Sequence, residues 1–461
     1  MVDLVEFMNS VLSILDTNGL TDVDSVREFV HKRATSELIS LTEGLREAML
    51  QSSDPALRGM EKPSLDQANF LPSSSLRGAS GCAAWQCRVQ KIRILKRYIA
   101  LYCDMGVVPV NLDWNYSAND GQPDIAAKHH LVGSILALVE LRPLIESGLA
   151  VVVPEALRLC AKHWEEAVPG YAKIVGSAKK LCEMKASKFT ATYEPIVAGN
   201  QRLGIINFTG PDEYLDHGKI SRLLHSFPPW VPIKRRLRRW KIPLSTIRNR
   251  GLLLPFFRGM ANDVLLQGYF SSVHNARYVT DLPGELEFYQ LLNKRDALAE
   301  QTASLCARLT HTIPLMGDVP IERILKIRRE DPEAFQNYRS TLTGIVKTYV
   351  HAGHVVSDRE AREIYVDLLK PQLDALQAKA VSVKRAQIKK GAVKVAATTA
   401  IMGLGIYTGL LPSELASLVK AVGGFSIARD MVETIASIKD EPTEVQNHNL
   451  YFLLRLRQTS R

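Results

Sequence analysis

The amino-terminal part of the chain has apolar residues at helical spacing. Residues 4–15 carry an apolar stripe, and Asn18-Gly19 follows as a stop signal. A second helix is predicted to begin at Thr21, which can cap the amide of Asp24, and to carry its stripe on to Met49. Both stripes are expected to face a core.

Two short apolar runs farther along the chain indicate buried strands. Residues 106–112 and 149–153 are rich in β-branched residues and bounded by Gly or Pro, and residues 126–145 between them have a helical pattern. The sequence therefore predicts a strand, helix, strand unit.

An alternating pattern indicates a further β element. Residues 188–197 alternate Thr with apolar residues, and residues 202–208 are again rich in β-formers. The residues between them, Gly199-Asn200, are typical of a tight turn. We predict a β-hairpin here.

The carboxyl-terminal half returns to helical signals. Residues 331–333, Asp-Pro-Glu, have the cap, the first-turn proline and the acidic first turn of a helix start. Ser357 and Glu360 form a capping box for a later helix, which Pro371 is expected to kink.

An uncharged stretch, residues 395–413, begins a glycine-rich apolar helical hairpin that we predict over residues 395–428. About 19 residues in a helix reach about 28 Å, close to the thickness of a bilayer core. Because Ala, Thr and Gly dilute its hydrophobicity, we favour a buried, soluble hairpin over membrane insertion. The G-x-x-x-G spacing allows close helix approach, and the predicted membrane or helix-packing residues are Ile401, Gly405, Ile406 and Gly409.

Length and composition indicate a folded protein of several parts. The chain has 461 residues, more than one core usually supports, with 46% hydrophobic and 23% charged residues. Residues 51–81 are rich in Ser, Pro and Gly, and we interpret them as a linker or long surface loop. The fold is expected to be mainly α with a small α+β portion, in four parts: N-terminal helices and linker (1–81), a mixed α/β region with the hairpin (82–218), a basic aromatic segment (219–261) and a C-terminal helical domain (262–461).

Cysteine usage and the first residues bear on the compartment. Six cysteines are scattered through a long chain, so we expect reduced thiols. Residues 1–10 contain Asp3 and Glu6 but no Lys or Arg, and so lack the cationic start of a signal peptide. We expect a cytoplasmic protein, peripheral to or inserted in the inner membrane if it binds lipid.

The net charge of +10 is concentrated in one segment. Between His217 and Asn262 there is no Asp or Glu, while eleven Lys and Arg residues occur, so the rest of the chain is near neutral. Residues 234–241 form the densest run, which favours one anionic contact surface. Four aromatic residues lie in or near this run: Trp230, Trp240, Phe256 and Phe257.

Dense cations beside aromatic rings favour an anionic partner. Lys and Arg neutralise phosphates, and aromatic rings stack on bases or lie at lipid headgroups, so nucleic acid and an acidic membrane surface both fit. The competing interpretation is a solvated face or pairing with distant acids. Five prolines from Pro228 to Pro255 argue against a continuous recognition helix. The predicted anion-binding residues are Lys234, Arg235, Arg236, Arg238, Arg239, Trp240 and Lys241.

No catalytic or metal-binding motif is recognisable. His351 and His354 lie three apart without the Glu of a zinc protease motif, and Cys82 and Cys87 have no second cysteine pair at zinc-site spacing. We expect neither a metal nor a cofactor. A non-enzymatic binding or regulatory protein is the leading hypothesis. A membrane-associated effector using the 395–428 hairpin and an enzyme with a dispersed active site are the alternatives, and a protein partner and the oligomeric state stay open.

Three short runs, residues 100–109, 141–154 and 275–282, resemble segments of bacterial proteins that have no established activity. The resemblance covers a small part of the chain. It implies a bacterial, cytoplasmic origin and brings no catalytic residues with it.

Overall fold

The computed structural model divides the chain into two compact units, residues 1–325 with 342–362 and residues 326–341 with 363–461. The first unit contains both four-stranded sheets. The described residues are 4–58, 69–79, 84–112, 118–119, 122–123, 125–155, 162, 171–198, 201–215, 218–224, 227–274, 276–292, 302–307, 309, 319–349, 358–376, 378, 445, 448 and 450–458.

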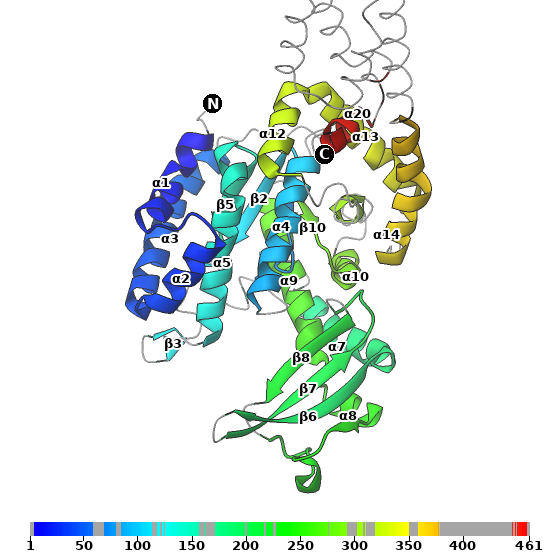
Figure 1. The fold of residues 1–461 in the computed structure, drawn as a ribbon. Helices are drawn as coiled ribbons and strands as arrows, with labels where there is room; N and C mark the ends of the chain where they lie inside the picture. Colours follow the sequence, from blue (N-terminus) through cyan, green and yellow to red (C-terminus); the bar gives the residue numbers. More distant parts are fainter. Residues whose placement is uncertain are drawn as a thin grey trace, which may run out of the picture. The chain divides into compact units, whose positions relative to one another are not determined.

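The first sheet is parallel, with the strand order β10-β1-β2-β5 (Figure 1). Helix α4 (Trp85–Tyr102) lies between β1 and β2 in the chain, and α5 (Ile125–Glu146) lies between β2 and β5. All six residues of β2 are buried, as expected for a parallel sheet covered on both faces. The predicted strand, helix, strand unit is confirmed as β2, α5 and β5. The strand bounds are β10 (Arg277–Val279), β1 (Asn69–Pro72), β2 (Met105–Val110) and β5 (Ala150–Pro154).

Three helices precede this sheet in the chain: α1 (Leu4–Thr17), α2 (Val23–Lys32) and α3 (Thr35–Arg58). The cap of α2 is Asp22 and not Thr21. The Asp22 carboxylate accepts a hydrogen bond from the Ser25 amide at 2.7 Å, and the Ser25 hydroxyl accepts one from the Asp22 amide at 3.0 Å. This reciprocal pair satisfies two free amides at once, which fixes the helix start after Asp22. The stripe predicted as one helix through Met49 is divided between α2 and α3.

The segment interpreted as a linker contributes to the core. Helix α3 runs on to Arg58, and residues 69–72 form the inner strand β1, all of whose residues are buried. The Ser-rich residues after β1 form a tight turn, in which the Arg77 amide donates to the Ser73 carbonyl at 3.2 Å and the Ser73 side chain is buried. The linker interpretation is therefore wrong for residues 69–79, because Ser and Gly here build a buried turn and not a solvated loop.

The second four-stranded sheet is antiparallel, with the order β8-β7-β6-β9. The predicted hairpin is confirmed: β6 and β7 pair with Ala198 opposite Gln201. The basic segment supplies both edge strands, β8 and β9. Side chains of the inner face pack on helices α7, α8 and α9 in one core that includes Tyr193, Phe208 and Phe257. The bounds are β8 (Lys219–Leu224), β7 (Gln201–Thr209), β6 (Thr190–Ala198), β9 (Trp240–Ile242), α7 (Tyr171–Lys185), α8 (Leu244–Asn249) and α9 (Leu254–Val273).

The helix start at Asp331 is confirmed, because the Asp331 carboxylate accepts a hydrogen bond from the Ala334 amide at 3.0 Å. Ahead of Pro371 the helix widens into a π turn, Tyr365–Leu369, in keeping with the carbonyl that a proline leaves without an amide partner. Ser357 lies outside the described residues. The remaining elements are β3 (Ala118–Asn119), β4 (Gln122–Pro123), α10 (Pro283–Leu292), α12 (Ile321–Glu330), α13 (Pro332–Tyr349), α14 (Asp358–Ile364), α20 (Tyr451–Gln458) and the short 3-10 helices η2 (Ala186–Lys188) and η4 (Ile233–Arg235).

A mainly helical fold with an α+β portion is confirmed. Within the described ranges, no helix has the length and apolarity needed to cross a bilayer. The predictions made for the apolar hairpin and for the histidine pair concern residues outside these ranges: residues 395–428 with Ile401, Gly405, Ile406 and Gly409, and also His351 and His354.

Gly204 of β7 gives a test of the antiparallel sheet. A Cβ at this position would lie 2.5 Å from Tyr193 Cε2 and 2.9 Å from the Tyr193 hydroxyl oxygen, so Gly204→Val must displace that buried ring. We expect a loss of about 1–3 kcal/mol in the free energy of unfolding, measured by urea denaturation. Gly268→Ala in α9 is the control, because its added methyl group meets open space, and it should leave stability unchanged or slightly raised. Equal stability of the Gly204→Val protein and the wild type would contradict the packing.

Candidate functional site

The predicted anion-binding residues lie in a compact turn that ends in an edge strand. We call residues 233–241 the basic tip. It begins with the three-residue helix η4, continues through a turn in which the Arg238 amide donates to the Arg235 carbonyl at 3.2 Å, and enters β9 at Trp240. The segment is thus a series of tight turns and not a continuous recognition helix, against which its prolines had argued.

Two residues of the basic tip attach it to the core. The Trp240 ring packs on that core and lies 6.1 Å from the Tyr193 ring. The buried Tyr193 donates its hydroxyl hydrogen to the Arg236 carbonyl at 3.0 Å, and the Arg236 guanidinium lies over the Phe227 ring at 5.1 Å. Trp240 and Arg236 therefore hold the turn in place, a role that the sequence pattern did not reveal.

Among the residues that the structure describes, the other cations of the basic tip face solvent and have no carboxylate partner. Across the described residues, none of the eleven Lys and Arg side chains between positions 219 and 258 forms an ion pair with a carboxylate. Arg235 lies over the Trp240 ring, with its guanidinium carbon 5.0 Å from the centroid, and is still exposed. Pairing with the acids of the described residues therefore does not neutralise this surface. The exposed cations of the basic tip are Lys234, Arg235, Arg238, Arg239 and Lys241.

The aromatic residues near the basic tip are mainly core residues. Phe257 is 1% exposed, and Phe256 makes an edge contact with Phe208 at 5.3 Å. Trp230 packs against the same core. Phe257 is thus inaccessible to a base, and the face of Trp240 is already covered by Arg235.

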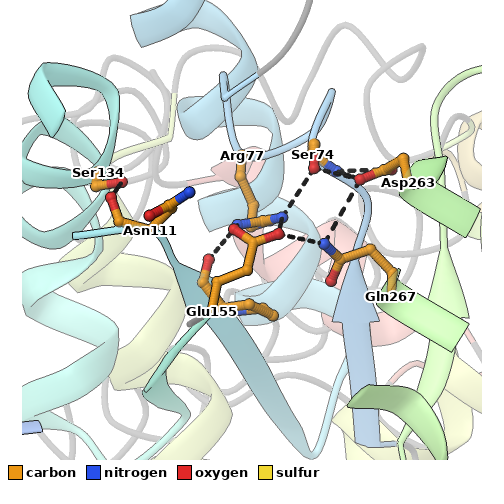
Figure 2. Close-up of polar contacts among 8 residues, drawn as sticks. Ser74, Arg77, Asn111, Ser134, Glu155, Asp263 and Gln267 are labelled. Atoms are coloured by element: carbon orange, nitrogen blue, oxygen red, sulfur yellow. Dashed lines mark hydrogen bonds and ion pairs between the residues drawn. The ribbon is translucent and has the colours of Figure 1, made fainter. Parts of the chain in front are cut away.

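A second group of polar residues meets at the carboxyl edge of the parallel sheet. We call Ser74, Arg77, Glu155, Asp263, Gln267, Tyr278, Thr280 and Glu285 the edge cluster. Figure 2 shows five of them pointing toward one another from the turn after β1, the end of β5 and helix α9. The sequence carries no local signal for this cluster, because two of its residues fall in the segment interpreted as a linker and the rest are scattered over residues 155–285.

An ion pair lies at the centre of the edge cluster. Arg77 is 2% exposed and binds both carboxylate oxygens of Glu155, at 2.9 and 3.0 Å. Arg77 also donates to the Ser74 hydroxyl at 2.9 Å and to the Pro109 carbonyl, while Gln267 donates to Glu155 at 2.7 Å. A bidentate, buried pair of this kind fixes both side chains in one geometry.

Two further carboxyl groups lie beside this ion pair. Asp263 accepts hydrogen bonds from the amide and hydroxyl of Ser74. The Tyr278 hydroxyl lies 2.9 Å from Glu285 Oε2 and 3.4 Å from Asp263 Oδ2, and Thr280 also donates to Glu285. Burial raises the pKa of Asp263, and burial together with the Asp263 charge raises the pKa of Glu285 well above its usual range. Both carboxyl groups therefore hold a proton more tightly than exposed carboxyl groups do.

The chemistry available to the edge cluster is limited. Over the described part of the chain, no group of three His, Cys, Asp or Glu side chains could hold a metal ion. The Ser74 hydroxyl donates to a carboxylate and accepts from a guanidinium, an arrangement without the histidine base that activates a serine nucleophile. The contacts fit a role in holding the sheet together.

Comparison with known proteins does not assign either site. No family model, no curated protein and no solved structure matches the chain. The short resemblance to bacterial proteins stays a prediction.

The ion pair of the edge cluster gives a stability test. Arg77→Met leaves the Glu155 charge buried without its main partner, so we expect the free energy of unfolding to fall by about 3–5 kcal/mol. Arg93→Met removes a 57% exposed cation from Glu140, which keeps Lys96, and should cost less than about 1 kcal/mol. Urea denaturation compares the two. Similar losses of unfolding free energy in both variants would show that the buried ion pair stabilises the fold no more than the exposed one.

The raised pKa of Glu285 predicts a pH dependence. Because the pKa of Glu285 is higher in the folded state than in the unfolded state, the folded state binds the Glu285 proton more tightly. The stability that this proton contributes is full below the unfolded-state pKa and is lost as pH rises through the folded-state pKa. Glu285→Gln should therefore flatten the decline of unfolding free energy measured between weakly acidic and weakly alkaline pH. Glu28→Gln is the control, because the Lys32 hydrogen bond lowers the pKa of Glu28 and its effect lies at more acidic pH. An unchanged slope in the Glu285→Gln protein would contradict the assignment.

Proposed function

We propose that this chain is a non-enzymatic binding protein that contacts a phosphate-bearing anionic partner through the basic tip. The observation that carries the proposal is the set of five exposed cations, residues 234, 235, 238, 239 and 241, that have no carboxylate partner within the described residues. Several cations in so short a stretch, without nearby carboxylates among the described residues, create a local positive potential. This potential attracts polyanions and accelerates their association.

The shape of the basic tip supports contact with phosphates more than reading of bases. A three-residue helix and tight turns cannot occupy a major groove as a recognition helix does. Arg and Lys on a turn can still neutralise phosphate oxygens, which gives binding without sequence preference. The anchoring of Arg236 and Trp240 supports the proposal as well, because a turn held by the core loses little freedom on binding.

The salt dependence of binding tests this proposal. The probes are a short DNA duplex and vesicles containing phosphatidylglycerol, each titrated over a range of NaCl concentrations. Arg238→Ser/Arg239→Ser should weaken binding, and for DNA it should lower the slope of log affinity against log salt by about one for each phosphate that the variant no longer neutralises.

Lys179→Ser/Lys180→Ser is the matched control. It also removes two exposed cations, but from helix α7 and not from the basic tip, and should leave both salt slopes near the wild-type value. If the two double variants behave alike on both probes, binding depends on net charge alone and the proposal fails.

A further inference from the structure

Two aliphatic side chains in the basic tip are unusually exposed. Ile233 is 77% exposed and Leu237 is 61% exposed, on either side of Lys234, Arg235 and Arg236. Leu244, just beyond the tip, is 38% exposed. Exposed aliphatic residues among cations are costly in water unless a partner covers them, so their position points to the chemistry of that partner.

A partner made only of phosphates does not account for Ile233 and Leu237. The phosphates of a nucleic acid offer no apolar surface to an aliphatic chain, and stacking on bases uses planar side chains. The Trp240 ring is already engaged, because it contacts both the Tyr193 ring and the Arg235 guanidinium. An anionic bilayer surface combines phosphates with an apolar layer a few ångströms deeper, which matches cations interleaved with aliphatic residues.

We propose that the basic tip docks on an anionic lipid surface, with Ile233 and Leu237 entering the headgroup boundary while Arg235, Arg238 and Arg239 contact lipid phosphates. This inference rests on the proposed function and deepens it by naming the partner. The docking is peripheral: it uses a turn of a few residues and no membrane-crossing helix. Charge complementarity brings the protein to the surface, and the two aliphatic side chains distinguish a bilayer from other polyanions.

The test separates the apolar contribution from the charge. Ile233→Ser/Leu237→Ser keeps every cation, so it should lower affinity for phosphatidylglycerol vesicles by about tenfold in a sedimentation assay and leave DNA binding unchanged. Met184→Ser is the control, because Met184 is 60% exposed on α7, outside the basic tip, and should affect neither probe. Vesicle binding retained by Ile233→Ser/Leu237→Ser, or DNA binding weakened in equal measure, would overturn the inference.

A second measurement reports insertion directly. A Leu237→Trp variant keeps an apolar side chain at the tip, and its fluorescence should be quenched by vesicles with brominated acyl chains more strongly than that of the wild type. Quenching no greater than that of the wild type would overturn insertion. If Arg238→Ser/Arg239→Ser leaves both vesicle and DNA binding unchanged, the proposed function itself fails. If that variant weakens binding to both probes while Ile233→Ser/Leu237→Ser weakens neither, only the lipid assignment is overturned.

Discussion

A buried arginine that must be neutralised fixes how the parallel sheet ends at its carboxyl edge. The Arg77 guanidinium reaches the turn after β1 through Ser74, the end of β2 through the Pro109 carbonyl, and the residue after β5 through Glu155. Burial opposes its charge, but Glu155 and Asp263 more than offset this, so the pKa of Arg77 is raised. A buried cation without partners is costly. The ends of β1, β2 and β5, which carry the partners of Arg77, must therefore lie close together at this edge of the sheet.

The same constraint explains the raised pKa values of the neighbouring carboxyl groups. The described edge cluster contains one cation, Arg77, and three carboxyl groups, Glu155, Asp263 and Glu285. If all three carboxyl groups were ionised, two negative charges in the cluster would have no cation to balance them, and burial together with this repulsion raises the pKa of Asp263 and Glu285. Helices α9 and α10, which carry these carboxyl groups, are thus tied to β10 by the hydrogen bonds of the Tyr278 hydroxyl.

The sequence pattern predicted the elements that depend mainly on residues close together in the chain. The β6–β7 hairpin follows from alternation and a two-residue turn, and the β2–α5–β5 unit from its two short apolar runs. Strand β1 escaped prediction because four residues, Asn69–Pro72, are too few for a periodic signal and Ser-rich sequence follows them. The edge cluster escaped because its contacts join residues far apart in sequence, 78 positions for Arg77 and Glu155 and 189 for Ser74 and Asp263. The charge pattern predicted the basic tip, but the contacts of Trp240 and Arg236 that hold it against the core are visible only in the folded structure.

A competing explanation for the basic segment is protection of sheet edges, since β8 and β9 are both edge strands and Lys or Arg on an edge discourages pairing with other chains. That explanation fits Lys219, Arg222 and Lys241, which lie on the strands themselves. It does not fit the turn before β9, because the arginines of this turn lie outside the paired strands. The exposed Ile233 and Leu237 of the turn would also promote association with other chains and not prevent it. The turn is therefore better explained as a surface that meets a partner than as one that repels neighbours.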